Sequence, residues 1–204
     1  MSISYPLSLP NVKAPAAIVV YADTVTSVSV SPFTLKQQIH VFDGQQWKAE
    51  ISLPRMKQED AQVWQAFLTA LRGVEGTFLM GDSSKTSPLG VASGSPQIRT
   101  NQSAGIETIL TKGWTPSITN ILKAGDMIQI ASRLHQVLLN TNSDGSGYAT
   151  LEIFPRLREA VSNSDTIITN NPKGLFRLSG SSQRVSVADN AKLQLLSYKA
   201  IEAI

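Results

Sequence analysis

Residues 121–157 constrain the fold of this chain more than any other segment, because short apolar stretches alternate there with turn residues. The stretches at 127–130, 134–139 and 148–154 are rich in residues that favour strands. Between them lie Ala-Gly-Asp and Asp-Gly-Ser-Gly, whose residues favour tight turns. This succession predicts a small β-barrel. The same segment contains few acidic or imidazole groups. We therefore expect a surface that binds or assembles, and not a catalytic centre.

The composition agrees with that expectation. Of the 204 residues, 42% are hydrophobic, which is sufficient for a core, and 16% are charged, against roughly 25% in an average soluble domain. The surface is therefore predicted to carry many uncharged polar side chains, which suit contacts with proteins. The net charge of +3 is not concentrated in a basic run, so nucleic acid binding is not indicated.

Several other classes are excluded or disfavoured by the sequence. The chain has no cysteine, which excludes disulfides and thiolate chemistry. It has no apolar run of the roughly 18 residues that a membrane span needs, and its first residues lack the pattern of a secretory leader. We expect a protein made in the cytoplasm, without membrane insertion and without a cofactor.

The N-terminal part predicts strands followed by one amphipathic helix. Residues 16–30 predict two strands, and residues 35–53 predict a hairpin with a hydrophobic side that turns at Asp43-Gly44. Residues 57–72 change to the i, i+3, i+4 spacing of a helix. Trp64 and Phe67 are expected to pack the helix against the hairpin, whose hydrophobic side carries the structural residue Trp47.

Two segments rich in Ser, Gly, Asn and Pro, residues 83–95 and 170–174, are typical of domain boundaries. They predict a first domain of residues 1–93 together with 172–204, and an inserted domain of residues 94–171. The chain is thus predicted to be mainly β. It would have a β-sandwich domain with one packed α-helix plus an inserted OB-like β-barrel domain.

The order of these pieces resembles that of the distal tail proteins of long, flexible-tailed bacteriophages, in particular the two-domain type with an OB-like second domain. The resemblance extends over nearly the whole chain and rests on pattern, without one specific motif. It is carried by the hairpin strand with Trp47, Ala49, Ile51 and Leu53, by residues 135–139, and by the segments DAQVWQAFLTALRG, AGIETIL, LKAGDMIQI, LEIFPRL and NPKGLFRL.

The resemblance implies a structural virion protein of the tail tip, without enzymatic activity. Such proteins form a ring, usually a hexamer, that joins the tail tube to the tip hub or fibres. The first domains would form the ring, and the OB-like domains would project from its outside. The implied partners are further copies of the chain, the tail tube protein, and hub or fibre proteins. A carbohydrate-binding module that contacts the host surface is the alternative function.

The barrel carries the candidate site residues. Trp114 and Tyr148 are candidates for an exposed aromatic platform that stacks on sugar rings or on a partner protein; in the alternative, they cap the ends of the barrel. Gly125 and Asp126 are expected to shape a tight turn, with the Asp126 carboxylate bonded to local backbone N–H groups. A cell-wall hydrolase would instead need two converging carboxylates, for which Asp126 and Glu152 are the candidates.

Two further patterns have a functional and a structural interpretation. Residues 140–145 resemble the start of a calcium-binding loop, but Leu151 stands where the loop needs a glutamate. A plain hairpin loop is therefore expected there. His40 and His135 lie within strand patterns without a nearby partner for a metal site, so both are predicted to be structural.

Assembly surfaces are predicted at the edges of the first domain. Ring closure would cover its strand edges and the polar loop at 83–95. The apolar residues 195–204 are expected to pack either in the ring interface or in the first sheet. Arg156 and Arg158 flank Leu157 and are expected on a solvated face, where guanidinium groups suit acidic partners.

Overall fold

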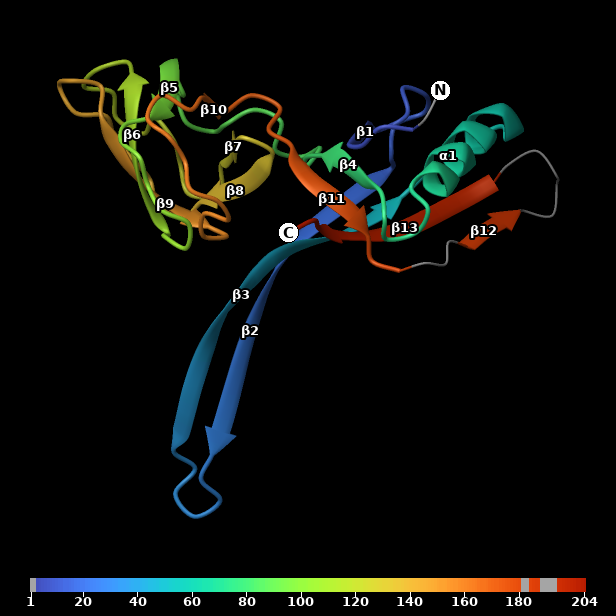
Figure 1. The fold of residues 1–204 in the computed structure, drawn as a ribbon, viewed down its shortest axis with the longest axis horizontal. Coiled ribbons are helices and arrows are strands. Elements are labelled where there is room, and N and C mark those ends of the chain that lie inside the picture. The colour runs from blue at the N-terminus through green and yellow to red at the C-terminus, as the bar shows by residue number, and fades with distance from the viewer. Residues whose placement is uncertain (1–2, 181–183, 188–193) are drawn as a thin grey trace.

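The computed structural model describes residues 3–180, 184–187 and 194–204 (Figure 1). The described chain is mainly β, with one helix, and contains a sandwich-like sheet and a nearly closed, barrel-like sheet. The predicted fold class is confirmed. None of the described helical residues forms an apolar segment long enough to cross a membrane.

The larger sheet has seven strands, which come from both ends of the chain. Its order is β1 (Leu7–Ser8), β4 (Thr77–Met80), β11 (Gly174–Leu178), β13 (Gln194–Glu202), β3 (Gln37–Ser52) and β2 (Ala17–Val30), and β12 (Arg184–Val187) pairs with β13. The C-terminal strand β13 lies between β11 and β3. The C-terminal segment thus occupies the first sheet, which is one of the two places expected for it.

Helix α1 (Gln58–Ala70) packs against the buried face of this sheet. Its apolar positions recur at helical spacing, so Trp64 and Phe67 point inward together. Their rings meet Tyr198 of β13 and Phe78 of β4, with centroids 6.3 and 5.7 Å apart. Beyond the helix, Arg72 adopts a positive φ of 49°. The predicted helix and its packing on the sheet are confirmed.

The smaller sheet is formed entirely by residues between β4 and β11. Its order is β10 (Ile167–Ile168), β7 (Met127–Ile130), β8 (Arg133–Val137), β9 (Ala149–Phe154), β6 (Thr108–Trp114) and β5 (Gly94–Ile98). A bridge between Gln97 and Thr166 brings its two ends together. Since β4 and β11 pair with each other directly, the chain leaves and re-enters the larger sheet at neighbouring strands.

Strands β2 and β3 differ from the prediction. One strand, Ala17–Val30, forms in place of the two predicted for residues 16–30, and β3 runs without a turn through Asp43-Gly44 to Ser52. The pairing Thr24–Gln45 is followed by Thr26–Val41, so residues 42–44 lie opposite Val25 alone. Gly44 fits there because an added Cβ would lie 2.8 Å from Val25 Cγ2. The predicted turn is therefore a bulge, and the hairpin turns at residues 31–36 instead.

Candidate functional site: a projecting arm

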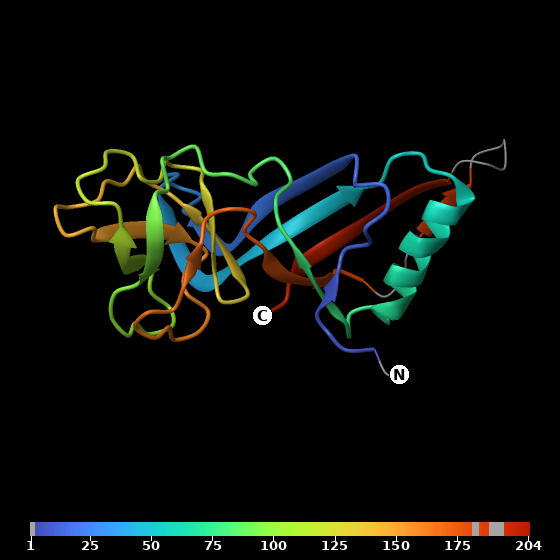
Figure 2. The ribbon, with the colours of Figure 1, turned by 90° about the horizontal axis from the view of Figure 1, so that it is seen from above.

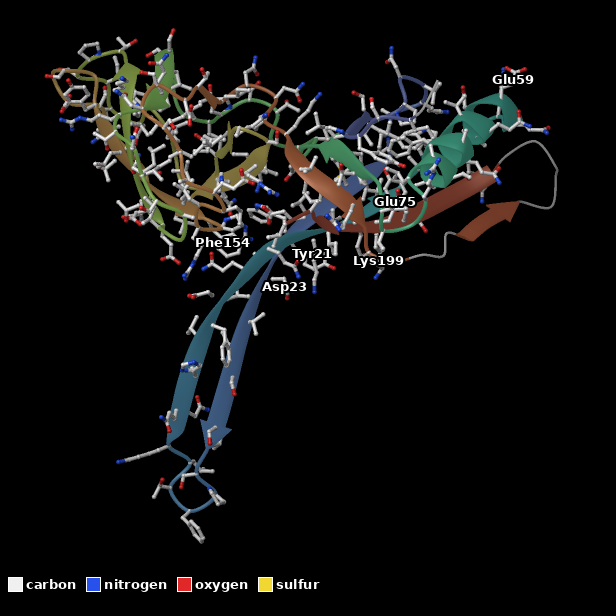
Figure 3. The ribbon with its side chains drawn as sticks, viewed as in Figure 1. Tyr21, Asp23, Glu59, Glu75, Phe154 and Lys199 are labelled. Atoms are coloured by element: carbon white, nitrogen blue, oxygen red, sulfur yellow. The ribbon has the colours of Figure 1, made fainter. Side chains whose placement is uncertain are left out.

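The outer part of the β2–β3 hairpin projects beyond the other strands of the larger sheet and away from the barrel-like sheet (Figure 1). We define this outer part, residues 24–44, as the arm. Every residue of the arm is exposed apart from the half-buried Ser31. Figure 3 shows its side chains standing clear of the rest of the described chain. By contrast, the inner part of the same hairpin carries Trp47, Ala49 and Ile51, which are all buried.

One face of the arm is apolar. Val28 pairs with Ile39, and the neighbouring Val30 and Val41 lie on the same side of the two strands. These four side chains are 48 to 61% exposed. The bulge adds two residues to β3, which preserves the alternation, so this face continues the side that carries Trp47 in the core. We call these four residues the arm ridge.

The tip of the arm presents two larger apolar side chains. Phe33 is 94% exposed and Leu35 is 75% exposed. The loop is closed by hydrogen bonds from Ser31 N to Lys36 O (3.0 Å) and from Leu35 N to Ser31 O (2.9 Å). Leu35 has a φ of 55°, a left-handed conformation that costs a leucine roughly 1 to 2 kcal/mol. An exposed leucine held in this conformation suggests a contact surface.

The opposite face of the arm is more polar. It carries Ser27 and Ser29 of β2, with Gln38 of β3. His40 and Phe42 also lie on this face, with ring centroids 4.5 Å apart in an edge-on contact. His40 is exposed, and its imidazole lies against the ring of Phe42.

The barrel contacts the root of the arm through Arg156. Its guanidinium lies 2.6 Å from Asp43 Oδ1 and 3.0 Å from Glu107 Oε1, and its backbone N–H donates to Gln45 Oε1 at 3.0 Å. Gln45 in turn donates to Glu107 at 3.1 Å. The arm therefore leaves the body at a point where β3 and the barrel are joined by charged and polar contacts.

A buried ion pair lies beside this junction. Arg158 Nη2 is 3.1 Å from Glu202 Oε2, with the side chains 10% and 2% exposed, and the same group donates to Gln45 O. Glu202 also accepts the Trp47 backbone N–H at 3.1 Å. The prediction that Arg156 and Arg158 lie on a solvated face is wrong. The acidic partners, Asp43, Glu107 and Glu202, are distant in sequence from the two arginines, so spacing along the chain could not indicate them.

His135 is buried in the same region. It is 1% exposed, and its Nδ1 lies 2.7 Å from Pro155 O. The pKa of His135 is lowered from 6.5 to about 4, chiefly by burial and also by the charges of Arg158 and Arg133, against the raising effect of the Pro155 contact. Nearby, Trp47 Nε1 donates to Leu134 O at 2.9 Å, and the Trp47 ring meets Phe154 edge-on. The imidazole is therefore neutral and structural at pH 7.

The predicted aromatic platform is not present on the barrel surface. Trp114 is 3% exposed, and its indole N–H donates to Thr111 Oγ1 at 2.8 Å. Tyr148 is half-buried, and the guanidinium carbon of Arg99 lies 3.9 Å from its ring centroid. Trp114 therefore belongs to the barrel core, and the platform interpretation of this residue is wrong.

Asp126 fastens the segment that connects the two sheets. Its carboxylate accepts backbone N–H groups of Leu89 (2.7 Å), Gly90 (3.1 Å) and Lys123 (2.8 Å). Gly125 precedes it with a φ of +100°. Glu152 instead accepts the Thr108 hydroxyl at 2.7 Å. The carboxylate of Asp126 thus holds backbone of its own turn and of the connecting segment at Leu89 and Gly90.

The loop at 140–145 has the bonding of a structural turn. Asn140 Oδ1, Asn142 Oδ1 and Asp144 Oδ1 all accept backbone N–H groups, at 2.8 to 2.9 Å. Across the described residues, no three His, Asp or Glu side chains gather where they could hold a metal ion. The two asparagine oxygens thus accept backbone N–H groups of Asn120 and Ala124 in a neighbouring segment, and Asp144 accepts those of its own loop.

Comparison with protein-family models gives no match, and comparison with curated protein sequences gives none either. The function must therefore be argued from the arm and its surroundings. The arm was missed as a site by sequence reasoning, although a signal was present. Between Thr24 and Phe42 the only charged residue is Lys36, and apolar residues alternate with Ser, Thr and Gln on both strands.

Proposed function

We propose that this chain is a non-enzymatic structural protein that assembles with further copies of itself into a ring at the distal end of a long, flexible phage tail. The ring joins the tail tube to the tip hub or fibres. The tail-tip location and the neighbours in the tail rest on the resemblance in the order of hairpin, helix, inserted barrel and returning strands. The observation that supports assembly is the uncovered arm.

An isolated two-stranded hairpin is at best marginally stable in water. The arm extends such a hairpin beyond the core while exposing the arm ridge and the tip residues Phe33 and Leu35. A contiguous apolar surface of this kind marks an interaction site on a soluble protein. We therefore expect the arm to be stabilised by contact with a partner surface that covers its apolar side chains.

Further copies of the chain are suitable partners because the sheet also has a free edge. Strand β2 is the last strand on one side of the larger sheet, so one row of its backbone groups has no neighbouring strand among the described residues. Closure of a ring covers such edges on every copy at once. The arm would reach along the adjacent copy and extend the contact beyond the edge itself.

Immunogold electron microscopy of tailed particles from the source culture tests the proposed location. Gold at the distal end of the tail tube is expected. A shortened variant, with residues 28–39 replaced by Asn-Gly so that Ser27 and His40 flank a two-residue turn, removes most of the arm. It is expected to fold but to be absent from the tails. Intact tailed particles that contain no trace of the wild-type chain would refute the proposed function.

A further inference from the structure

The outer face of α1 carries almost no charge. From Gln62 to Ala70 its exposed and half-buried side chains are Gln, Val, Ala and Thr, with acidic residues only in the first turn of the helix. A helix face that remains in water normally carries charged residues. This face is therefore unusual for a permanently solvated surface.

A shallow hollow lies along this face. It has a volume of about 590 Å³. Small residues, Ala66 and Ala70, lie in it beside Ile3, which is 45% exposed. The remaining lining residues are Gln62, Gln65, Thr69 and Arg72. An apolar side chain in this hollow would contact methyl groups and amide groups, with Arg72 as the one charged lining residue.

A second hollow fits an apolar occupant less well. It has a volume of about 290 Å³, and its lining includes the charged residues Asp82 and Lys173. Burying uncharged side chains against these groups would remove water from them without supplying a partner. Of the two hollows, the one beside α1 is therefore the better receptor for an uncharged protrusion.

We propose that the arm tip, Phe33 and Leu35, of one copy seats in the hollow beside α1 of the next copy. This inference rests on the proposed ring and specifies its contact. The tip and α1 lie toward opposite ends of the molecule in Figure 1, and Figure 2 shows the barrel and α1 at opposite ends of the larger sheet.

Two different, complementary surfaces on one chain give head-to-tail contacts, which form a ring when the rotation between copies closes, whereas a self-complementary arm would give two-fold dimers. Each surface carries one basic group, Lys36 at the tip and Arg72 at the hollow, so charge does not draw the two surfaces together and the contact would rest on the burial of apolar side chains. Phe33 is an aromatic side chain, and aromatic side chains contribute much of the apolar area that interfaces bury.

The absence of native cysteines allows a direct cross-linking test. Thr34→Cys marks the tip and leaves Phe33 and Leu35 in place, and Gln62→Cys marks the wall of the hollow. The two purified variants are mixed and treated with a short bismaleimide. A covalent dimer is expected in the mixture, at a yield about tenfold above that of Thr34→Cys mixed with Ser146→Cys, which lies on an exposed barrel loop.

A second substitution in the tip tests specificity. Adding Phe33→Asp to the Thr34→Cys chain is expected to abolish the excess cross-linking, whereas Ser29→Asp on the polar face of the arm is expected to preserve it. Equal yields with Gln62→Cys and Ser146→Cys would overturn the inference. So would a predominant product from Thr34→Cys alone, which would show that arms pair with each other.

The failure of this inference can be distinguished from failure of the proposed function. Rings at the tail tip without the cross-link would leave the proposed function standing and reject this contact. The cross-link without any presence of the chain in tails would support the contact and reject the tail-tip role. Ala66→Glu, compared with Gln58→Glu outside the hollow, gives an independent check, because only the former is expected to prevent assembly.

Discussion

The guanidinium Nη1 of Arg156, in the barrel, lies 2.6 Å from the carboxylate Oδ1 of Asp43, at the bulge of β3. A charged group of the barrel thus holds the root of the arm, which belongs to the larger sheet. The side chain of Asp43 is 91% exposed, whereas that of Arg156 is 22% exposed. The backbone of Arg156 is bonded to Gln45 as well, so side chain and main chain both contact the root. This arrangement makes the barrel a brace for the arm.

Arg156→Ala is therefore expected to let the arm adopt a wider range of orientations relative to the barrel. The free energy of unfolding should change little. An ion pair with one well-exposed partner contributes at most about 1 kcal/mol. Spin labels at Thr34→Cys and Ser146→Cys would report the distance between tip and barrel by pulsed electron resonance. A broadened distance distribution is predicted, and Arg99→Ala, which alters the far contact with Tyr148, should leave it unchanged. Equal distributions in both variants would reject the brace.

The buried pair of Arg158 and Glu202 is expected to matter more for folding. Removing one partner of a buried pair leaves the other charge unsatisfied and costs roughly 3 to 5 kcal/mol. Arg158→Met should lower the free energy of unfolding by about this amount in urea titrations. The matched surface pair, Lys199 with Glu50 at 2.6 Å, is largely exposed, so Lys199→Met should have no measurable effect. Similar losses in both variants would contradict this difference.

His135 predicts a loss of stability in mild acid. The unfolded chain binds the imidazole proton with a pKa near 6.5, and the folded chain binds it only near 4. The neutral, buried form therefore stabilises the fold fully above pH 6.5. That contribution, about 3 kcal/mol, is lost as the pH falls toward 4 and then levels off. Urea titrations across this range measure it.

His135→Gln serves as the control for that acid sensitivity, because the amide does not titrate. Carboxylates titrate in both proteins, so the difference between their stability curves isolates the imidazole. The variant should be less stable at pH 7 but should lose less on acidification. Parallel curves between pH 6.5 and 4 would show that His135 is not the source.

The arm ridge should affect assembly without affecting the folded subunit. Val28→Asp places a charge on a side chain that is 53% exposed, so the free energy of unfolding should change by no more than about 0.5 kcal/mol. In a ring, the same charge would be buried without a partner and would prevent incorporation. Ser29→Asp, on the opposite face of the same strand, is the control. Normal incorporation of the Val28→Asp chain into tails would contradict this role.

The parts of the fold that follow from local pattern were predictable from the sequence. The helical spacing of Trp64 and Phe67 indicated both the helix and its buried face, and turn residues indicated the barrel. The arm was not predictable in this way. Asp-Gly is a strong hairpin signal, but Asp43 and Gly44 occupy a bulge, where the lack of a Cβ accommodates Val25.

The sequence patterns did not indicate which side chains are buried or which distant residues they contact. Alternation indicated an apolar side on the strand that carries Ile39, yet it did not show that this strand pairs with the strand of Val28, or that no core lies opposite them. Trp114 was a candidate for a surface platform, with a position at the end of the barrel as the alternative. In the structure, its ring enters the barrel core and bonds Thr111. Contacts between distant strands, such as Arg158 with Glu202, likewise depend on the topology.

A cryo-electron microscopy reconstruction of the tail tip tests the central claim most directly, because it would show both the location of the chain and the environment of its arm. The predicted result is a closed ring of copies in which each arm lies against the neighbouring copy and the arm ridge is covered. Density for the chain with its arms extended freely into solvent, or a tail tip that lacks the chain, would contradict the claim.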